Sequence, residues 1–271
     1  MNCGLSENHC IGPVTHGFKR MVKGIIKASG YSIRRLKELP PRAPDIRHAD
    51  VLPFATYSPW LGDDEFNQTY EIIRNNTLVD CYRCYELWQL LAQVAKLASG
   101  DLLEVGVWRG GTGALIGGRC RSLALEATIY LCDTFRGVVK AGSQDSTYVG
   151  GEHADTERRA VIELCNRLQV KRFRVLEGIF PDDTGHEVED KQFRFCHIDV
   201  DTYQSAKDVA EWVWPRLVPG GMIVYDDYGF YTCTGITRFV NEERSKPDRI
   251  VIHNLNGHGI VIRLPQCQQP V

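Results

Sequence analysis

The stretch Phe193-Arg194-Phe195-Cys196-His197-Ile198-Asp199-Val200-Asp201 joins a largely apolar run directly to two aspartates. A second run, from Met222 to Asp227, has the same form and ends in an adjacent pair of aspartates. Short apolar runs of this kind are typical of buried strands in a parallel sheet, where ligands bind beyond the carboxyl ends of the strands. We therefore expect four carboxylates to converge on one small volume at that edge: Asp199, Asp201, Asp226 and Asp227.

Four carboxylates that close together would repel one another strongly in a partly dry cleft. A hard divalent cation would compensate their charge, because all-oxygen ligation suits Mg²⁺, Ca²⁺ or Mn²⁺. The alternative is that these aspartates cap the helices that follow the strands. Capping alone is a poor explanation for the adjacent pair Asp226-Asp227. The sequence therefore predicts a metal site.

Length and composition indicate an ordinary globular protein. The 271 residues fit one α/β domain with extensions, and the net charge of −2 predicts no bulk attraction to nucleic acid. The sequence contains no run of 18 apolar residues and no signal-peptide pattern. Of its ten cysteines, Cys81 and Cys84 form a lone C-x-x-C pair that we interpret as structural. Three others lie within apolar patterns and should be buried thiols of a cytoplasmic protein: Cys132, Cys165 and Cys196.

The N-terminal part differs in charge from the rest of the chain. Between His16 and Arg42 lie eight basic residues and one acidic residue, and apolar residues at helical spacing predict a basic amphipathic helix over 16–29. Two roles remain open for this arm, contact with an anionic membrane surface or contact with the core or a second subunit of a homo-oligomer. The stiff sequence Pro40-Pro41-Arg42-Ala43-Pro44 follows. We expect an arm and linker over 1–50 and one catalytic domain over 51–271.

Strand and helix patterns alternate through the remainder of the chain. Such alternation predicts an α/β fold, a doubly wound and mostly parallel seven-stranded sheet of Rossmann-like type. The predicted strands are 102–107, 128–132, 173–176, 193–198, 222–225, 249–253 and 259–264. The predicted helices are 84–98, 110–123, 155–168, 206–217 and 235–243.

The turn after the first predicted strand forms a second candidate site. It runs from Glu104 to Gly113 with glycines in the pattern G-x-x-x-G-G-x-G, which matches neither the G-x-G-x-x-G dinucleotide pattern nor a P-loop. Glycines at such a turn let a ligand approach the backbone closely. Asp133, at the end of the second strand, could accept hydrogen bonds from both ribose hydroxyls of a nucleoside. Glu104 favours a ligand with a cationic amino group over a pyrophosphate.

These motifs together resemble the macrocin O-methyltransferase family, which includes magnesium-dependent sugar O-methyltransferases of macrolide and aminocoumarin pathways. The resemblance covers roughly residues 65 to 264. It is carried by Glu104–Thr112, Cys132–Gly137, His197–Tyr203, Pro215–Gly221 and Val224–Gly229. The chain departs from the family pattern at Val138-Val139, where Leu-Pro is usual, and at Thr202, where leucine is usual.

The resemblance implies a class I methyltransferase that uses S-adenosylmethionine and Mg²⁺ or Mn²⁺. It makes Asp199, Asp226 and Asp227 the metal ligands and Asp201 the general base. It implies that the cofactor is held by Thr77, Glu104, Gly106, Arg109, Gly110, Gly111, Thr112 and Asp133. The acceptor would be a hydroxyl of a sugar or glycosylated metabolite, or of a surface-glycan or lipid-linked saccharide.

The expected chemistry is consistent with these residue types. A cation that binds the acceptor hydroxyl lowers its pKa, and a nearby carboxylate removes the proton. The segment from Gly142 to His153, rich in Gly, Ser and Asp, has the composition of a mobile cover over such a site.

Four other interpretations fit parts of the sequence. Asp199-x-Asp201 also resembles the motif of manganese-dependent nucleotide-sugar glycosyltransferases, which would not predict the Glu104 turn. Tyr203 and Lys207 have the spacing of a small NAD-dependent reductase, but they directly follow the acidic cluster. A binding module that kept the fold would not need the metal and base positions filled. The fourth interpretation is zinc ligation by His197, His253 or His258. The alternative is that these are buried, hydrogen-bonded histidines.

Overall fold

The structure is a computed structural model that describes residues 21–22, 24, 26, 28–29, 39–52 and 54–265. The chain divides into two compact units, Met1–Glu38 and Leu39–Val271. In the first unit the described residues 21, 22, 24, 26 and 28 are helical, as predicted for 16–29, and the rest of that predicted helix lies outside the described residues. The domain boundary near residue 50 stays a prediction.

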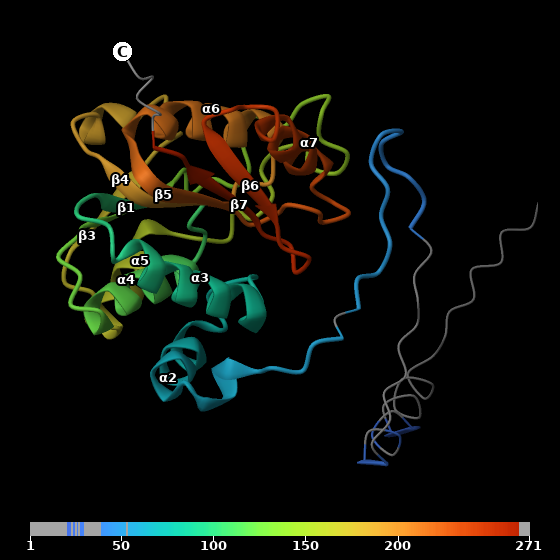
Figure 1. Ribbon diagram of the computed structural model, residues 1–271, viewed down its shortest axis with the longest axis horizontal. Coiled ribbons are helices and arrows are strands. Elements are labelled where there is room, and N and C mark those ends of the chain that lie inside the picture. The colour runs from blue at the N-terminus through green and yellow to red at the C-terminus, as the bar shows by residue number, and fades with distance from the viewer. Residues whose placement is uncertain are drawn as a thin grey trace, which may run out of the picture. The chain divides into compact units, whose positions relative to one another are not determined.

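The second unit is built on a seven-stranded sheet of order β3-β2-β1-β4-β5-β7-β6 (Figure 1). The pairs among β1 to β5 are parallel, whereas β7 runs antiparallel to both β5 and β6. The mostly parallel α/β sheet predicted from the sequence is thus confirmed. Its strands are β1 Asp101–Val105, β2 Ile129–Asp133, β3 Phe173–Glu177, β4 Phe193–Ile198, β5 Leu217–Tyr225, β6 Arg249–His253 and β7 Gly259–Arg263.

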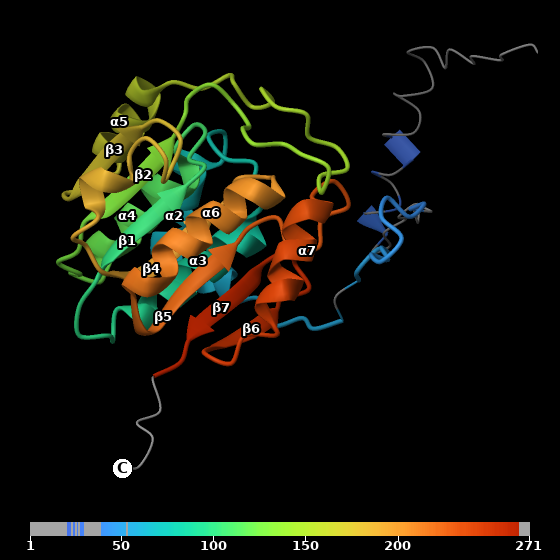
Figure 2. The same ribbon diagram turned by 90° about the horizontal axis from the view of Figure 1, so that it is seen from above.

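Helices cover both faces of this sheet. The α-helices are α2 Asp64–Ile73, α3 Cys81–Val94, α4 Gly111–Ser122, α5 Arg158–Arg167, α6 Tyr203–Val213 and α7 Thr234–Glu243. Short 3₁₀ helices are η1 Pro59–Gly62, η2 Gly185–Val188 and η3 Trp214–Arg216. The α3, α4 and α5 helices lie on one face, and α6 and α7 lie on the other (Figures 1 and 2). The fold is therefore doubly wound.

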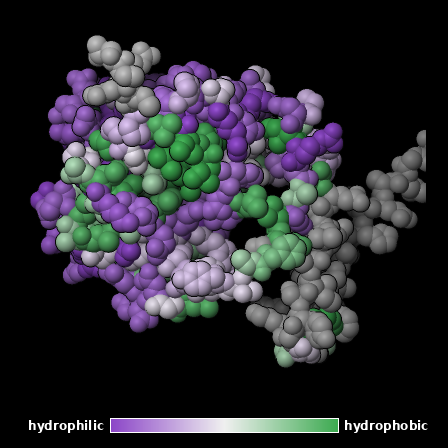
Figure 3. Space-filling view, in the orientation of Figure 1, coloured by the Kyte–Doolittle hydropathy of each residue, from purple (hydrophilic) through white to green (hydrophobic). Residues whose placement is uncertain are grey.

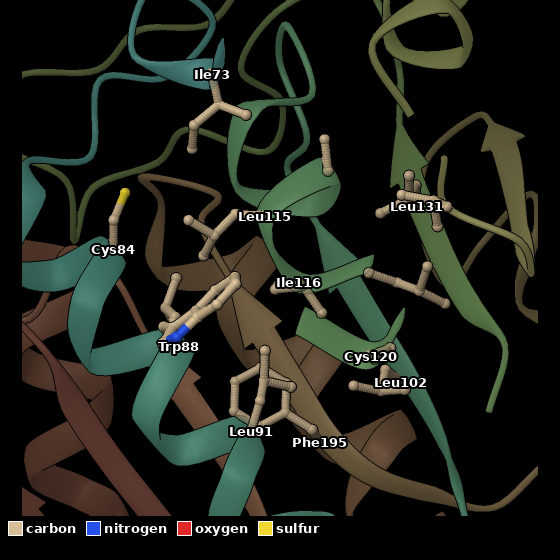
Figure 4. Close-up of a cluster of buried hydrophobic side chains, with 14 of the residues drawn as sticks. Ile73, Cys84, Trp88, Leu91, Leu102, Leu115, Ile116, Cys120, Leu131 and Phe195 are labelled. Carbon is tan, nitrogen blue, oxygen red and sulfur yellow. The ribbon is translucent and has the colours of Figure 1, made fainter. Parts of the chain in front are cut away.

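The alternation of side chains along each strand divides the core between the two faces. Leu102 and Phe195 belong to the cluster beneath α3 and α4, whereas Leu103 and Cys196 belong to the cluster beneath α6 and α7. Figure 4 shows the first cluster, in which Trp88 of α3 packs among leucines and Phe195. The seven described cysteines are all free, and Cys132, Cys165 and Cys196 are fully buried, as predicted.

Several elements differ from the sequence prediction, and α3 and α6 each end four residues earlier, at Val94 and Val213. The β5 strand begins at Leu217 rather than Met222, so Pro219-Gly220-Gly221 lies inside the strand instead of in a turn before it. The ladder between β4 and β5 shifts register between Phe193 and Phe195, which lets the strand continue through residues that usually break one. Helix α2 was not predicted. It begins with the Asp63 side chain accepting a hydrogen bond from the Phe66 N–H.

The face shown in Figure 3 is polar over much of its area, with apolar side chains gathered over edge strand β6. Ile250 and Ile252 of that strand are exposed. Within the described ranges, no helix is long and apolar enough to cross a membrane.

Candidate functional site

A cavity of about 280 Å³ lies at the carboxyl ends of the central strands. Its lining includes Gly106, Trp108 and Asp133 at one end and the four predicted aspartates at the other. The two motifs singled out in the sequence therefore open into one space. This is the edge at which open α/β sheets bind their ligands.

The turn after β1 passes directly against the end of β4. Gly106 has φ 89°, and a Cβ atom built on it would lie 1.7 Å from the Asp199 carbonyl oxygen. No residue other than glycine fits this close approach without moving the backbone. The turn and the acidic strand end are thus held at a fixed spacing.

Asp133 braces the same turn. Its carboxylate accepts hydrogen bonds from the backbone N–H groups of Val107 (2.8 Å), Trp108 (2.7 Å) and Phe135 (2.7 Å). Burial raises the pKa of this carboxyl above its usual value, although the backbone hydrogen bonds oppose the shift. Oδ2 accepts from both Val107 and Trp108, so the capacity to accept a further hydrogen bond from a ligand lies on Oδ1.

The start of α4 packs tightly against the segment that precedes α3. The Gly111 N–H donates to the Asn76 carbonyl oxygen at 3.0 Å, and a Cβ on Gly111 would lie 2.7 Å from that oxygen. This contact brings Thr77 to the cavity wall, where Thr112 also lies. Gly110 and Gly111 shape the turn without lining the cavity. Arg109 also lies outside the lining, and its guanidinium stacks on Trp108 and pairs with Asp155.

Glu104 is fully buried on the α4 side of β1 and does not line the cavity. Its Oε1 lies 2.8 Å from Nδ1 of His197, the residue opposite it on β4. Its Oε2 has no hydrogen-bond partner, and a Cβ on Gly113 would lie 2.5 Å from it. Direct contact between Glu104 and a cofactor therefore stays a prediction.

Hydrogen bonds that extend the parallel ladder align the acidic residues. The Asp199 N–H donates to the Val105 carbonyl oxygen at 2.9 Å, and the Asp226 N–H donates to the Ile198 carbonyl oxygen at 3.0 Å. Asp201 adopts φ 62°, an uncommon conformation for a residue other than glycine. The result is that carboxylate oxygens of Asp199, Asp226 and Asp227 lie within 4.8 Å of one another.

Asp226 differs from its neighbours because basic groups surround it. Its Oδ2 pairs with the Arg83 guanidinium, and its Oδ1 lies 3.0 Å from Nε2 of His258. Burial alone would raise its pKa, but the His197 ring 3.7 Å from Oδ1, the hydrogen bond from His258 and the charge of Arg83 hold it well below its usual range. Asp226 is therefore ionised.

The other three carboxyl groups lack such compensation. Burial and repulsion from neighbouring carboxylates raise the pKa of Asp199 well above its usual value and that of Asp227 to about 6. Burial and the charge of Asp227 raise the pKa of Asp201 to about 7, although a hydrogen bond with Tyr148 opposes the shift. These shifts measure how strongly the cluster disfavours further negative charge in the absence of a cation.

The donor set fits a hard divalent cation. The Asp227 Oδ2 atom is buried and has no hydrogen-bond partner, and it belongs to the group of three carboxylates that approach one another. An unpartnered buried carboxylate oxygen is costly unless a cation or water satisfies it. All-oxygen ligation favours Mg²⁺ or Mn²⁺ over zinc.

The segment 142–153 covers part of the cavity. Tyr148 lines it beside Asp201, and Val138 and Val139, the departure from the family pattern, line it as well. The segment around Arg42 contacts this cover. Arg42 donates to the Thr147 hydroxyl at 2.8 Å and stacks on Tyr231.

Several lining residues were not anticipated from the sequence. Arg83 and Leu78 come from the α3 region, and Phe230 follows the acidic pair of β5. Arg83 lies one residue before the helix predicted over 84–98, so the apolar pattern did not single it out. Tyr203 and Lys207 do not line the cavity and pair instead with Glu242 and Glu211, so the reductase interpretation loses its support.

Solved structures share this fold at low sequence identity. The O-methyltransferase NovP aligns with a TM-score of 0.58 at 23% identity, covering 70% of this chain and 83% of that one. CalS11, a calicheamicin methyltransferase, aligns with a TM-score of 0.58 at 14% identity, covering 80% of this chain and 99% of that one. The fold is that of the class I methyltransferases.

The particular family follows from the sequence match. The model of the family described as Macrocin-O-methyltransferase (TylF) matches residues 60–255, so the chain belongs to that family of O-methyltransferases. The predicted resemblance is confirmed.

Characterised relatives are similar over part of their length. Demethyldecarbamoylnovobiocin O-methyltransferase of Streptomyces niveus is 29% identical over 64% of this chain and 69% of its own length. A tetracenomycin rhamnosyl 4'-O-methyltransferase of Streptomyces olivaceus is 32% identical over 49% of this chain and 55% of its own length. Mycinamicin III 3''-O-methyltransferase of Micromonospora griseorubida is 27% identical over 56% and 64%.

Proposed function

We propose that this chain transfers a methyl group from S-adenosylmethionine to a hydroxyl of a sugar or glycosylated small molecule, with a divalent cation at the acidic cluster. One observation carries the proposal: a single cavity joins the glycine turn and Asp133 to the four aspartates. The names of the relatives support a glycoside acceptor, because they describe enzymes that act on novobiocin-type, tetracenomycin and mycinamicin compounds.

The nucleoside end of the cofactor would lie beside Gly106 and Asp133, with the ribose hydroxyls donating to Asp133. Thr77 and Thr112, on the same wall, would contact its amino-acid end. Gly110 and Gly111 would act from behind this wall by fixing the turn, and direct contact of Glu104 or Arg109 with the cofactor stays a prediction. The methyl group would then point toward the aspartates.

Asp199, Asp226 and Asp227 would hold the cation, which lowers the pKa of the bound acceptor hydroxyl. Asp201 accepts the hydroxyl proton as the oxygen forms its bond to the methyl carbon and the carbon–sulfur bond breaks. Tyr148 lies beside Asp201 and lowers the pKa of that carboxyl, which favours its ionised form. The cover that carries Tyr148 limits the access of water, and in-line orientation of the two substrates supplies much of the rate.

The first test measures thermal unfolding with S-adenosylmethionine, NADH or a nucleotide sugar. Only S-adenosylmethionine should raise the melting temperature. Asp133→Ala should abolish that increase. Asp101→Ala is the matched control, because Asp101 also accepts a backbone hydrogen bond, from Thr128, at the opposite end of the same strands.

The second test incubates the protein with labelled S-adenosylmethionine, a panel of glycosides and Mg²⁺, with and without a chelator. Label should enter a glycoside only when the cation is present. Binding of a nucleotide sugar with no response to S-adenosylmethionine would refute the proposal. Transfer only to lipid-linked or surface saccharides would support the proposed methyl transfer but would change the proposed class of acceptor.

A further inference from the structure

A row of buried polar side chains runs behind the acidic cluster. Glu104 of β1 and His197 of β4 are directly paired across the sheet, and Asp226 and His258 lie on the same face beyond them. Glu86, on the overlying helix α3, ends the row. None of these residues except Asp226 lines the cavity. The row therefore contacts the site from behind.

His258 is the central link of this row. Its side chain is fully buried, with Nε2 3.0 Å from Asp226 Oδ1 and Nδ1 2.6 Å from Glu86 Oε2. Each ring nitrogen thus faces a carboxylate oxygen, and a nitrogen that carries a proton donates it to that oxygen. The imidazole thus ties a helix carboxylate to a cluster carboxylate.

Glu86 is itself held in place. It accepts hydrogen bonds from the side-chain amides of Asn254 and Asn256, in the turn between β6 and β7 that also carries His258. The helix and the turn therefore share one network. The Glu86 side chain is 17% exposed, whereas the His258 side chain is fully buried. Water can therefore solvate a substituted side chain more easily at position 86 than at position 258.

The two oxygens of Asp226 have different partners, His258 on Oδ1 and Arg83 on Oδ2. Rotation of the carboxylate would break both contacts, so its orientation is fixed. Each oxygen still has a second lone pair. A carboxylate held in this way presents its free lone pairs in one fixed direction. Outer partners of metal ligands orient those ligands in the same manner.

We propose that His258 and Glu86 are positioning residues that orient Asp226 for the divalent cation, acting from outside the cavity through a Glu86–His258–Asp226 network. This inference rests on the proposed function, since it presumes that Asp226 contacts the cation. It gives a positioning function to His258 and Glu86, which neither line the cavity nor belong to the family motifs.

The experiment measures Mg²⁺ and Mn²⁺ affinity of the full chain by calorimetry, for the parent and for Glu86→Gln and His258→Gln. Loss of an outer partner of a metal ligand typically weakens metal binding by roughly 10- to 100-fold. We expect that range for His258→Gln and roughly 10-fold for Glu86→Gln, which keeps the shape and removes the charge. S-adenosylmethionine should still raise the melting temperature of both variants as in the parent. Saturating Mg²⁺ should restore most of the turnover.

His253→Gln is the matched control, because His253 belongs to the same β-hairpin but packs its ring against Tyr228. It should bind Mg²⁺ as the parent does. Unchanged metal affinity in both test variants would overturn the inference, and so would equal losses of metal and S-adenosylmethionine binding, which indicate a merely structural role. A parent that binds neither cation would overturn the metal part of the proposed function and this inference with it. Metal binding by the parent with unaffected variants would overturn this inference alone.

Discussion

Asp199 and Asp201 are two residues apart and line the same cavity, but their surroundings differ. Asp199 belongs to the trio of carboxylates that approach within 4.8 Å, whereas Asp201 lies near Asp227, Cys233 and Tyr148. We predict that Asp201→Asn lowers turnover by roughly 10²–10⁴, as for a lost general base, while metal and S-adenosylmethionine affinities stay within about twofold. Single-turnover kinetics and calorimetry measure the two quantities.

Asp199→Asn is the companion variant. It should weaken Mg²⁺ binding, and excess Mg²⁺ should partly restore its activity. If Asp201→Asn loses the metal as severely as Asp199→Asn does, Asp201 is a ligand and the base lies elsewhere.

Gly106 is the residue at which the backbone leaves no room for a side chain. Its positive φ disfavours any L-residue, and the Asp199 carbonyl occupies the place of a Cβ. We predict that Gly106→Ala lowers the free energy of unfolding by about 2 kcal/mol or more and weakens S-adenosylmethionine binding. Urea unfolding measures the first effect. Gly62→Ala, where nothing lies within 4 Å of the added Cβ, should leave stability nearly unchanged.

At the scale of elements, the segment from Leu39 to His48 fastens the cover over the cavity. Arg42 contacts Thr147 and the Tyr231 ring, and the Tyr231 hydroxyl donates to the Pro40 carbonyl oxygen at 3.0 Å. Removing one hydrogen bond and one cation–π contact costs about 1–2 kcal/mol of local stability. Arg42→Ala should therefore speed hydrogen exchange of residues 142–153 by roughly 5- to 30-fold. Arg47→Ala, at an exposed arginine of the same segment, should leave that exchange unchanged.

Strands with a continuous apolar pattern were predicted most accurately. The β4 strand occupies the predicted 193–198, because its residues are buried on both faces and nothing in its sequence competes with an extended conformation. The start of β5 was predicted too late, since Pro219 and Gly220 usually break strands and only the tertiary register shift accommodates them. Helix α2 was missed although Phe66, Tyr70 and Ile73 have the i, i+4, i+7 spacing of one helix face.

For the site, local sequence patterns were sufficient where the strands themselves end. The convergence of the four aspartates and Asp133 on one cavity follows from parallel strands ending at one edge. The partners of Asp226 could not be predicted in this way. Arg83 and Glu86 come from α3 and His258 from a distant hairpin, and their meeting depends on how that helix lies across the sheet. Long-range packing of this kind leaves no periodic signal in the sequence.

At the scale of the whole molecule, the two units contain different features. The second unit, Leu39–Val271, contains the sheet, both core clusters and the segment that carries Arg42. We predict that a chain lacking residues 1–38 keeps the parent melting temperature within about 2 °C and binds S-adenosylmethionine, because every core residue among those the structure describes lies at Ala43 or later. A chain lacking residues 1–48 should also lose the protection of 142–153, because Pro40 and Arg42 are removed. Failure of the shorter deletion to fold would show that the first unit belongs to the core.

The first unit concentrates the positive charge of the chain, with seven basic residues and one acidic residue between Lys19 and Glu38. If its function is contact with an anionic membrane, the full chain should sediment with phosphatidylserine vesicles at low salt and be released at high salt, because screening shortens the reach of surface charge. The chain lacking residues 1–38 should stay in the supernatant under both conditions, and vesicles of neutral lipid should bind neither protein. Absence of sedimentation at low salt would instead favour a contact between subunits. In that case the full chain should show a larger mass than the shortened chain by light scattering, after allowance for the 38 missing residues.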